Sequence, residues 1–263
     1  MIKLIASDVD GTLVPEGSPC LNPELIETIK ELKKKGIIFV AASGRQFVSL
    51  HRFFEPVAND VIFIAENGGY VTCRGREIEC SAMDRPLLEE IVAYMRGEKE
   101  GFGIVNTPWK AYTETKDQTF LNMLRNGYQM ECDQMEDLLT LNEPIVKASV
   151  YFRGDAGRKV AEAKKRFGDR VHIMAAGVHW MDFVRNDVDK GNALARIQDL
   201  MRISKEETMA FGDNNNDIGM LLRAGESYAV ANARDEAKQA ARYIAESNEH
   251  DGVLKVLRTL LQR

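Results

Sequence analysis

The stretch that decides the fold runs from Lys3 to Ala42 and reads KLIASDVDGTLVPEGSPCLNPELIETIKELKKKGIIFVAA. It opens with a short apolar run that ends at Asp8, and it closes with a second apolar run, Ile37 to Ala42. Between them, residues 23–35 place leucine and isoleucine at helical spacing, and Gly36 ends that pattern. Strand, helix and strand in this order predict a βαβ unit with parallel strands and a right-handed crossover.

The same kind of pattern extends outward from this unit. Helix and strand signals recur as helix Phe47 to Phe54, strand Val61 to Ala65, helix Lys190 to Met201 and strand Thr208 to Gly212. Apolar strands without polar alternation are typical of a parallel sheet that helices cover on both faces. We therefore expect residues 1–83 and 186–263 to form one α/β core.

Between these two segments, from residue 84 to residue 185, the pattern changes. Helical stretches are mixed there with strands of alternating polarity, such as Lys147 to Phe152 and Val178 to Val184. This pattern predicts an α+β domain inserted into the core. Trp109 and Trp180 both lie in this stretch, and we expect both side chains to pack in its interior.

The composition limits the classes of function. Hydrophobic residues make up 44% and charged residues 29% of the 263 residues, which is typical of a globular protein. The net charge is -5 with Lys and Arg spread along the chain, which argues against nucleic acid or an anionic membrane as the main partner. The longest apolar run, Ile37 to Ala42, is far shorter than the roughly 18 residues of a membrane span. We expect a cytoplasmic monomer or small homo-oligomer with free cysteines.

Acidic side chains follow two of the predicted strands. Asp8 and Asp10 come at the end of the first strand, and a separation of two residues in an extended backbone would point both the same way. Asp213 and Asp217 follow a later strand in an Asn-rich segment, and they share one face if that segment is helical. The carboxyl ends of parallel strands form the ligand crevice of such sheets. Four carboxylates there would suit Mg²⁺, although each segment alone also fits an ordinary capped turn.

Groups suited to a phosphate lie at the same predicted edge. Ser43 and the backbone N–H groups beside Gly44 follow the second strand and can donate to phosphate oxygens, although Ser43 also fits a helix N-cap. Lys190 begins a helix, where its charge opposes the helix dipole, so either pairing with anions or simple solvation explains it. Arg45 is either a substrate contact or a surface charge. The four segments together offer the groups that phosphoryl transfer needs.

In order, these motifs resemble the haloacid dehalogenase superfamily, and closely its Cof-type sugar-phosphatase branch. The matching segments are Asp8-Val9-Asp10-Gly11-Thr12-Leu13, Ser43-Gly44-Arg45, Lys190-Gly191 and Gly212-Asp213-Asn214-Asn215-Asn216-Asp217. The resemblance implies a Rossmann-like core with an inserted α/β cap at residues 84–185. Such a cap acts as a lid that excludes water and selects the substrate.

The resemblance also implies a role for each matching residue. Asp8 would be the nucleophile, and Asp10 would protonate the leaving oxygen and later activate the attacking water. The Mg²⁺ site would comprise Asp8, the backbone carbonyl of Asp10, and Asp213. Asp217 would support this site from nearby. The transferring phosphoryl group would be held by Ser43, Gly44, Lys190 and Asn216.

The expected activity is Mg²⁺-dependent hydrolysis of a small phosphorylated metabolite, such as a sugar phosphate, through an aspartyl-phosphate. Two alternatives stay open. Phosphomannomutases share the motif order and the cap type, so a phosphosugar mutase is the enzymatic alternative. The other is a non-catalytic protein that binds a phospholigand, against which the complete set of catalytic positions argues.

Overall fold

The computed structural model describes residues 1–128 and 130–262 and divides the chain into two compact units. We call Met1–Glu79 with Asp189–Arg263 the core, and Cys80–Val188 the cap. These bounds lie a few residues outside the cap boundaries that the sequence predicts. Each unit has its own sheet, and no described helix is long and apolar enough to cross a membrane.

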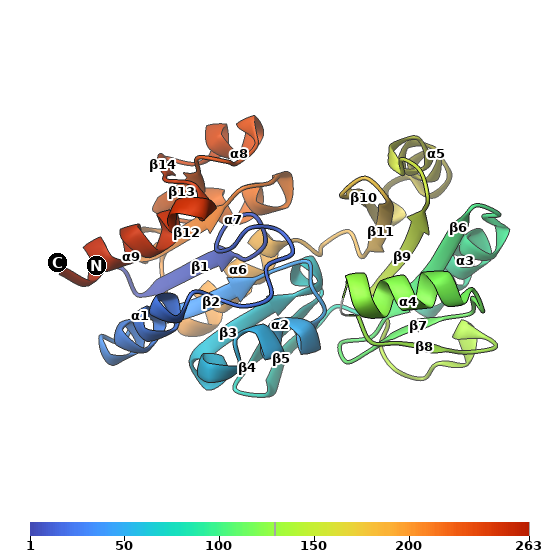
Figure 1. The fold of residues 1–263 in the computed structure, drawn as a ribbon, viewed down its shortest axis with the longest axis horizontal. Helices are drawn as coiled ribbons and strands as arrows, with labels where there is room; N and C mark the ends of the chain where they lie inside the picture. The colour runs from blue at the N-terminus through green and yellow to red at the C-terminus, as the bar shows by residue number, and fades with distance from the viewer. Residues whose placement is uncertain (129, 263) are drawn as a thin grey trace. The chain divides into compact units, whose positions relative to one another are not determined.

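An eight-stranded sheet forms the centre of the core (Figure 1). Its strands in chain order are β1 (Leu4–Asp8), β2 (Ile38–Ala42), β3 (Val61–Ala65), β4 (Tyr70–Cys73), β5 (Arg76–Cys80), β12 (Thr208–Gly212), β13 (Glu226–Val230) and β14 (Tyr243–Ala245). In space they lie in the order β14-β13-β12-β1-β2-β3-β4-β5, and all are parallel from β14 to β3. Because β1 lies between β2 and β12, the connections lead away from it in opposite directions. The carboxyl ends of β1 and β12 therefore form the crevice where open sheets bind ligands.

Helices cover the core sheet on both faces. They are α1 (Pro23–Lys34), α2 (Phe47–Phe53), α6 (Lys190–Met201), α7 (Ile218–Leu222), α8 (Asp235–Ala240) and α9 (Gly252–Gln262). α1 packs against α9, whereas α6 packs against α7 and α7 against α8. Right-handed crossovers in the two directions place α1 and α6 on opposite faces. Accordingly, β1, β3 and β12 are buried along their whole length.

Local sequence signals explain the bounds of α1. The Asn22 side chain accepts a hydrogen bond from the backbone N–H of Glu24, and Pro23 occupies the first helical position. Gly36, with a φ of 76°, takes the left-handed conformation that lets the chain leave the helix. The helix is one residue shorter than the predicted 23–35 pattern.

The cap contains a six-stranded sheet in the order β10-β11-β9-β6-β7-β8. Its strands are β6 (Gly101–Asn106), β7 (Ala111–Thr113), β8 (Cys132–Gln134), β9 (Lys147–Phe152), β10 (His172–Ala176) and β11 (Trp180–Val184), and its helices are α3 (Arg85–Gly97), α4 (Gln118–Gly127) and α5 (Gly157–Phe167). α3 and α5 pack on one face of the sheet in a large apolar cluster. α4 packs on the other face through Phe120 and Leu124.

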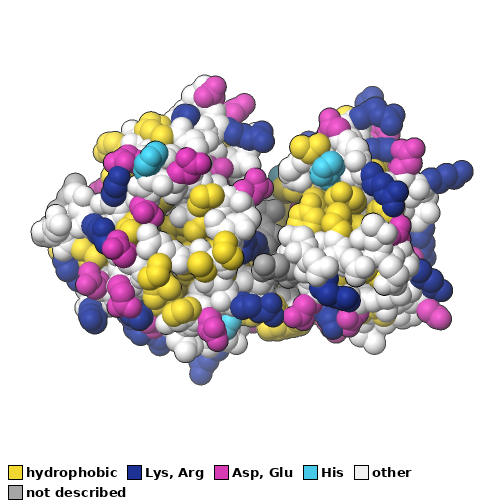
Figure 2. All heavy atoms as spheres, in the orientation of Figure 1, with side chains coloured by type: hydrophobic (Ala, Val, Ile, Leu, Met, Phe, Trp, Pro, Cys, Tyr) yellow, Lys and Arg dark blue, Asp and Glu magenta, His cyan; other side chains and the backbone are white. Residues whose placement is uncertain are grey.

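The two tryptophans of the cap differ in environment. Trp180 packs beside α4, with its ring centroid 5.1 Å from that of Tyr151 and 5.6 Å from that of Tyr128. Figure 2 shows hydrophobic side chains gathered on this face of the cap. Trp109 is 50% exposed, so the expectation that both tryptophans pack in the interior is wrong for Trp109.

Candidate active site

Three carboxylates meet at the carboxyl ends of β1 and β12. β1 ends at Asp8, and β12 ends at Gly212, directly before Asp213. A single 3₁₀ turn, Asn215–Asp217, then brings back Asp217. Asp8, Asp213 and Asp217 each offer an oxygen within 4.8 Å of the others. The parallel pairing of β1 with β12 therefore joins acids from the two ends of the chain.

Glycines permit this close approach. A Cβ at Gly11 would lie 2.5 Å from Oδ2 of Asp213, and the φ of 90° at Gly11 also disfavours any other residue. A Cβ at Gly212 would lie 2.5 Å from the Cβ of Asp217. Thr12, next to Gly11, donates a hydrogen bond from its hydroxyl to Oδ1 of Asp213 at 2.8 Å. The loop after β1 is thus fitted against the segment after β12.

Lys190 lies inside the acidic cluster. Its Nζ donates to Oδ1 of Asp8 at 2.5 Å and to Oδ1 of Asp217 at 2.7 Å, and the residue has no exposed surface. Burial by itself lowers the pKa of this ammonium, but the attraction of Asp217 and Asp8 outweighs it and raises the pKa above its ordinary value. Lys190 is therefore charged at neutral pH, and a merely solvated lysine is excluded.

Asp217 supports the loop after β12. Its Oδ2 accepts hydrogen bonds from the backbone N–H groups of Asp213 and Asn214, both at 3.0 Å. Its Oδ1 accepts from Lys190, and the residue has no exposed surface. This carboxylate therefore fixes the backbone that presents Asp213.

The site has an excess of negative charge among the described residues, because the cluster holds three carboxylates and Lys190 supplies one ammonium. Burial and the neighbouring charge of Asp217 raise the pKa of Asp8 well above its ordinary value, and the same two causes raise that of Asp213. Oδ2 of Asp8 is buried and has no hydrogen-bond partner in the described chain. An unpaired buried oxygen beside two further carboxylates fits a hard divalent cation such as Mg²⁺.

Asp10 lies outside this cluster. The extended strand ends at Asp8, and the N–H groups of Leu13 and Val14 then donate to the carbonyl of Val9, which turns the chain. The Asp10 carboxylate accepts two hydrogen bonds from Arg45, from Nε at 2.8 Å and from Nη2 at 2.6 Å. The expectation that four carboxylates gather is therefore wrong, because the extended geometry stops before Asp10. A ligand role for the Asp10 backbone carbonyl stays a prediction.

The predicted phosphate-binding residues come from three segments, which are the loop after β2, the start of α6 and the loop after β12. Ser43 is buried directly after β2, and its Oγ accepts from the N–H of Arg45 at 3.1 Å. It does not cap α2, which begins at Phe47 after Gln46. Asn216 lies in the loop after β12, where its side-chain N–H donates to the side-chain Oδ1 of Asn67 at 3.0 Å.

The sequence pattern did not single out Asn67 as a site residue. Its backbone N–H donates to the carbonyl of Ser43, and its side chain lies 3.2 Å from where a Cβ on Gly44 would stand. Glu66 and Asn67 have φ values of 51° and 57°, which non-glycine residues seldom adopt. No local pattern in the sequence indicates the contact of Asn67 with Asn216, because the two residues are 149 positions apart.

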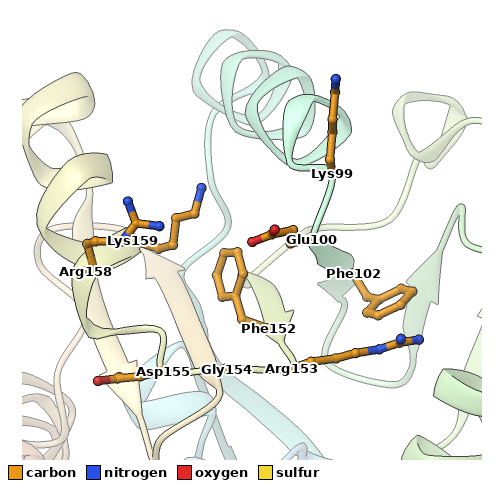
Figure 3. Close-up of a pocket in the computed structure, with 9 residues that line it drawn as sticks. All are labelled: Lys99, Glu100, Phe102, Phe152, Arg153, Gly154, Asp155, Arg158 and Lys159. Carbon is orange, nitrogen blue, oxygen red and sulfur yellow. The ribbon is translucent and has the colours of Figure 1, made fainter.

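The cap carries a surface groove of about 500 Å³ at the ends of β6 and β9 (Figure 3). Its charged side chains do not converge on one point, because Lys99 and Asp155 point away from its centre. Lys159 is already paired with Glu98 at 2.7 Å. The groove therefore lacks the convergent polar groups of a typical ligand site.

The chain that carries this site matches the family of haloacid dehalogenase-like hydrolases from residue 5 to residue 257. The chain belongs to this family. A 5-amino-6-(5-phospho-D-ribitylamino)uracil phosphatase of Escherichia coli (strain K12) is 30% identical over 262 residues, which cover 99% of this chain and 97% of that one. The resemblance found in the motifs is thereby confirmed.

Solved structures of the family share the fold. A crystal structure from Eubacterium rectale has a TM-score of 0.92 and 34% identity, covering 98% of this chain and 99% of that one. A subclass IIB sugar phosphatase of the superfamily has a TM-score of 0.80 at 21% identity, covering 98% of each chain. The predicted α/β core with an inserted cap is confirmed. As a haloacid dehalogenase-like hydrolase with phosphatase relatives, this chain is a phosphoric monoester hydrolase.

Proposed function

We propose that this hydrolase removes the phosphoryl group from small phosphomonoesters, sugar phosphates among them, by Mg²⁺-dependent attack of Asp8. The observation that carries the proposal is the state of Asp8. Lys190 holds one of its oxygens, while the other is buried without a hydrogen-bond partner among the described residues, beside Asp213. A carboxylate fixed in this way is oriented for attack on phosphorus.

The proposed reaction has two steps. A bond forms from Asp8 to phosphorus while the bond to the leaving oxygen breaks, and Asp10 gives that oxygen a proton. Water then attacks the phosphorus, its proton passes to Asp10, and Asp8 is released. The charge of Lys190 offsets charge that develops at Asp8 and on the phosphoryl oxygens.

Residues from the ends of β1, β2 and β12 and from the start of α6 would hold the ligands of this reaction. Mg²⁺ would be held by Asp8, Asp213 and the backbone carbonyl of Asp10, and when bound it would neutralise the carboxylates and the phosphoryl oxygens. Asp217 would keep Asp213 in place. The phosphoryl group would be held by Ser43, the N–H of Gly44, Lys190 and Asn216.

The substrate class follows from chemistry common to the relatives. The Escherichia coli relative is named for a phosphorylated ribityl compound, so that compound belongs in a substrate panel with hexose and pentose phosphates. We propose that the cap selects among them, as lids of this kind do. The cytoplasmic location inferred from the sequence stays a prediction.

Phosphate release from p-nitrophenyl phosphate and from the panel tests the proposal. The Asp8→Asn variant should lose Mg²⁺-dependent release, while Asp235→Asn, an exposed aspartate of α8, should keep it. Turnover by purified Asp8→Asn protein would remove Asp8 from the mechanism. Transfer of phosphate within a sugar, without release, would identify a mutase. Binding without any turnover across the panel would identify a regulatory protein.

A further inference from the structure

Arg45 is held in place by contacts with four residues. Its guanidinium donates two hydrogen bonds to the Asp10 carboxylate, one to each oxygen. It also lies over the ring of Phe53, with 4.4 Å between the guanidinium carbon and the ring centroid. Its backbone N–H donates to Ser43, and its carbonyl accepts from Glu66. An arginine fixed in this way differs from a free surface charge.

The contact determines how the Asp10 carboxylate is oriented. Two parallel hydrogen bonds to a planar guanidinium fix both the direction and the plane of a carboxylate, which a single contact does not. Among the described residues, Arg45 is the one hydrogen-bond donor to this carboxylate. The side chains of Arg45 and Asp10 are 22% and 27% exposed, so solvent reaches the pair without dominating it.

We propose that Arg45 is a positioning residue that orients the Asp10 carboxylate for proton transfer, and that Phe53 holds Arg45 in place. This inference rests on the proposed function, in which Asp10 is the acid and base. The proton moves from Asp10 to the leaving oxygen as the phosphorus–oxygen bond breaks and the bond to Asp8 forms. Arg45 neither gives nor takes a proton, and it contacts no reacting atom.

Two esters with different leaving groups test this role. p-Nitrophenolate leaves without a proton, whereas the alkoxide of glycerol 2-phosphate needs one. kcat/KM reports only the steps up to formation of the aspartyl-phosphate, so the later base step does not enter. In Arg45→Met, kcat/KM for glycerol 2-phosphate should fall on the order of 100-fold, because a general acid typically contributes that much. For p-nitrophenyl phosphate, kcat/KM should fall only about threefold, because its leaving group needs no proton.

Matched variants separate positioning from folding. Arg45→Lys keeps the charge but offers no two-point contact, so it should show the same difference between the esters. Phe53→Leu removes only the ring and should show a smaller difference. Arg76→Met, the same substitution at an exposed position of β5, should leave both esters unchanged. Thermal unfolding midpoints verify that each variant is folded.

The outcomes that overturn the inference are distinct. An equal loss for both esters would show that Arg45 acts on the phosphoryl group or on the fold, and no loss for either would show that Asp10 needs no orientation. If Arg45→Lys has the same ratio of kcat/KM values for the two esters as the wild type, the charge of Arg45 matters and its two-point contact does not. A wild-type protein that hydrolyses neither these esters nor any member of the substrate panel with Mg²⁺ would defeat the proposed function, and this inference with it.

Discussion

Lys190 is the residue on which the metal-free site most depends. It is fully buried and donates to Asp8 and Asp217, so removing its charge leaves three carboxylates without an ammonium. We expect Lys190→Met to lower the free energy of unfolding by about 3–5 kcal/mol in EDTA, because an unpaired buried charge is costly. Urea unfolding measures this.

A double variant checks the cause of that loss. Combining Lys190→Met with Asp8→Asn removes one of the repelling charges, so the pair should be more stable than the sum of the single effects. Strict additivity would mean that Lys190 stabilises the core through packing instead of charge.

Gly11 permits a second prediction at the scale of one residue. In Gly11→Ala the new methyl would meet Asp213, and we expect loss of Mg²⁺ affinity and of phosphate release. Gly17→Ala is the matched control, because Gly17 also has a positive φ of 79° but has nothing within 4 Å of an added Cβ. It should cost about 1–2 kcal/mol of backbone strain and leave the reaction intact. Equal inactivation of both variants would refute the steric argument.

At the scale of elements, the ends of β1 and β12 make stability depend on pH. The pKa values of Asp8 and Asp213 are raised by burial, so the folded chain binds more protons than the unfolded chain. Their contribution to stability is therefore present below about pH 4 and is lost as the pH rises through their folded-state pKa values. Mg²⁺ competes with those protons for the carboxylates. It should therefore stabilise the folded chain more at higher pH, where the carboxylates are ionised and repel one another.

We expect MgCl₂ to raise the thermal unfolding midpoint more at pH 7 than at pH 5, relative to EDTA. A free Mg²⁺ concentration of 100 times the dissociation constant would add about 2.7 kcal/mol to the free energy of unfolding. Asp213→Asn should lose most of this shift, because it removes a proposed ligand. The same shift at both pH values would contradict a site in which Mg²⁺ and protons compete.

At the scale of the whole molecule, the acid cluster belongs to one of the two compact units. Asp8, Asp213, Asp217 and Lys190 all belong to the core, whose sheet is continuous without the cap. We expect a protein in which a flexible linker replaces residues 80–188 to keep the stabilisation by Mg²⁺. It should hydrolyse p-nitrophenyl phosphate but distinguish poorly among sugar phosphates. Loss of the Mg²⁺ effect in a folded core would mean that the site needs cap residues.

Most of the core could be predicted because its signals are local. A buried parallel strand is a short apolar run, and the helix after it has its own periodicity and caps, as α1 shows with Asn22 and Pro23. β14 was missed, because a strand of three residues at the edge of the sheet has too few apolar residues to stand out. Trp109 was misplaced, because residue type alone does not reveal exposure.

The sequence by itself determined that the residues directly after β1, β2 and β12 lie along one edge of the core sheet, because the carboxyl ends of parallel strands share one edge. Only the tertiary structure decided which of these side chains contact one another. Asp8, Asp213 and Asp217 form one cluster in which Lys190 donates to Asp8 and Asp217, whereas the Asp10 carboxylate accepts from Arg45. The physical reason is that the direction of a side chain in a tight loop depends on contacts with distant segments, which strand and helix periodicity does not record.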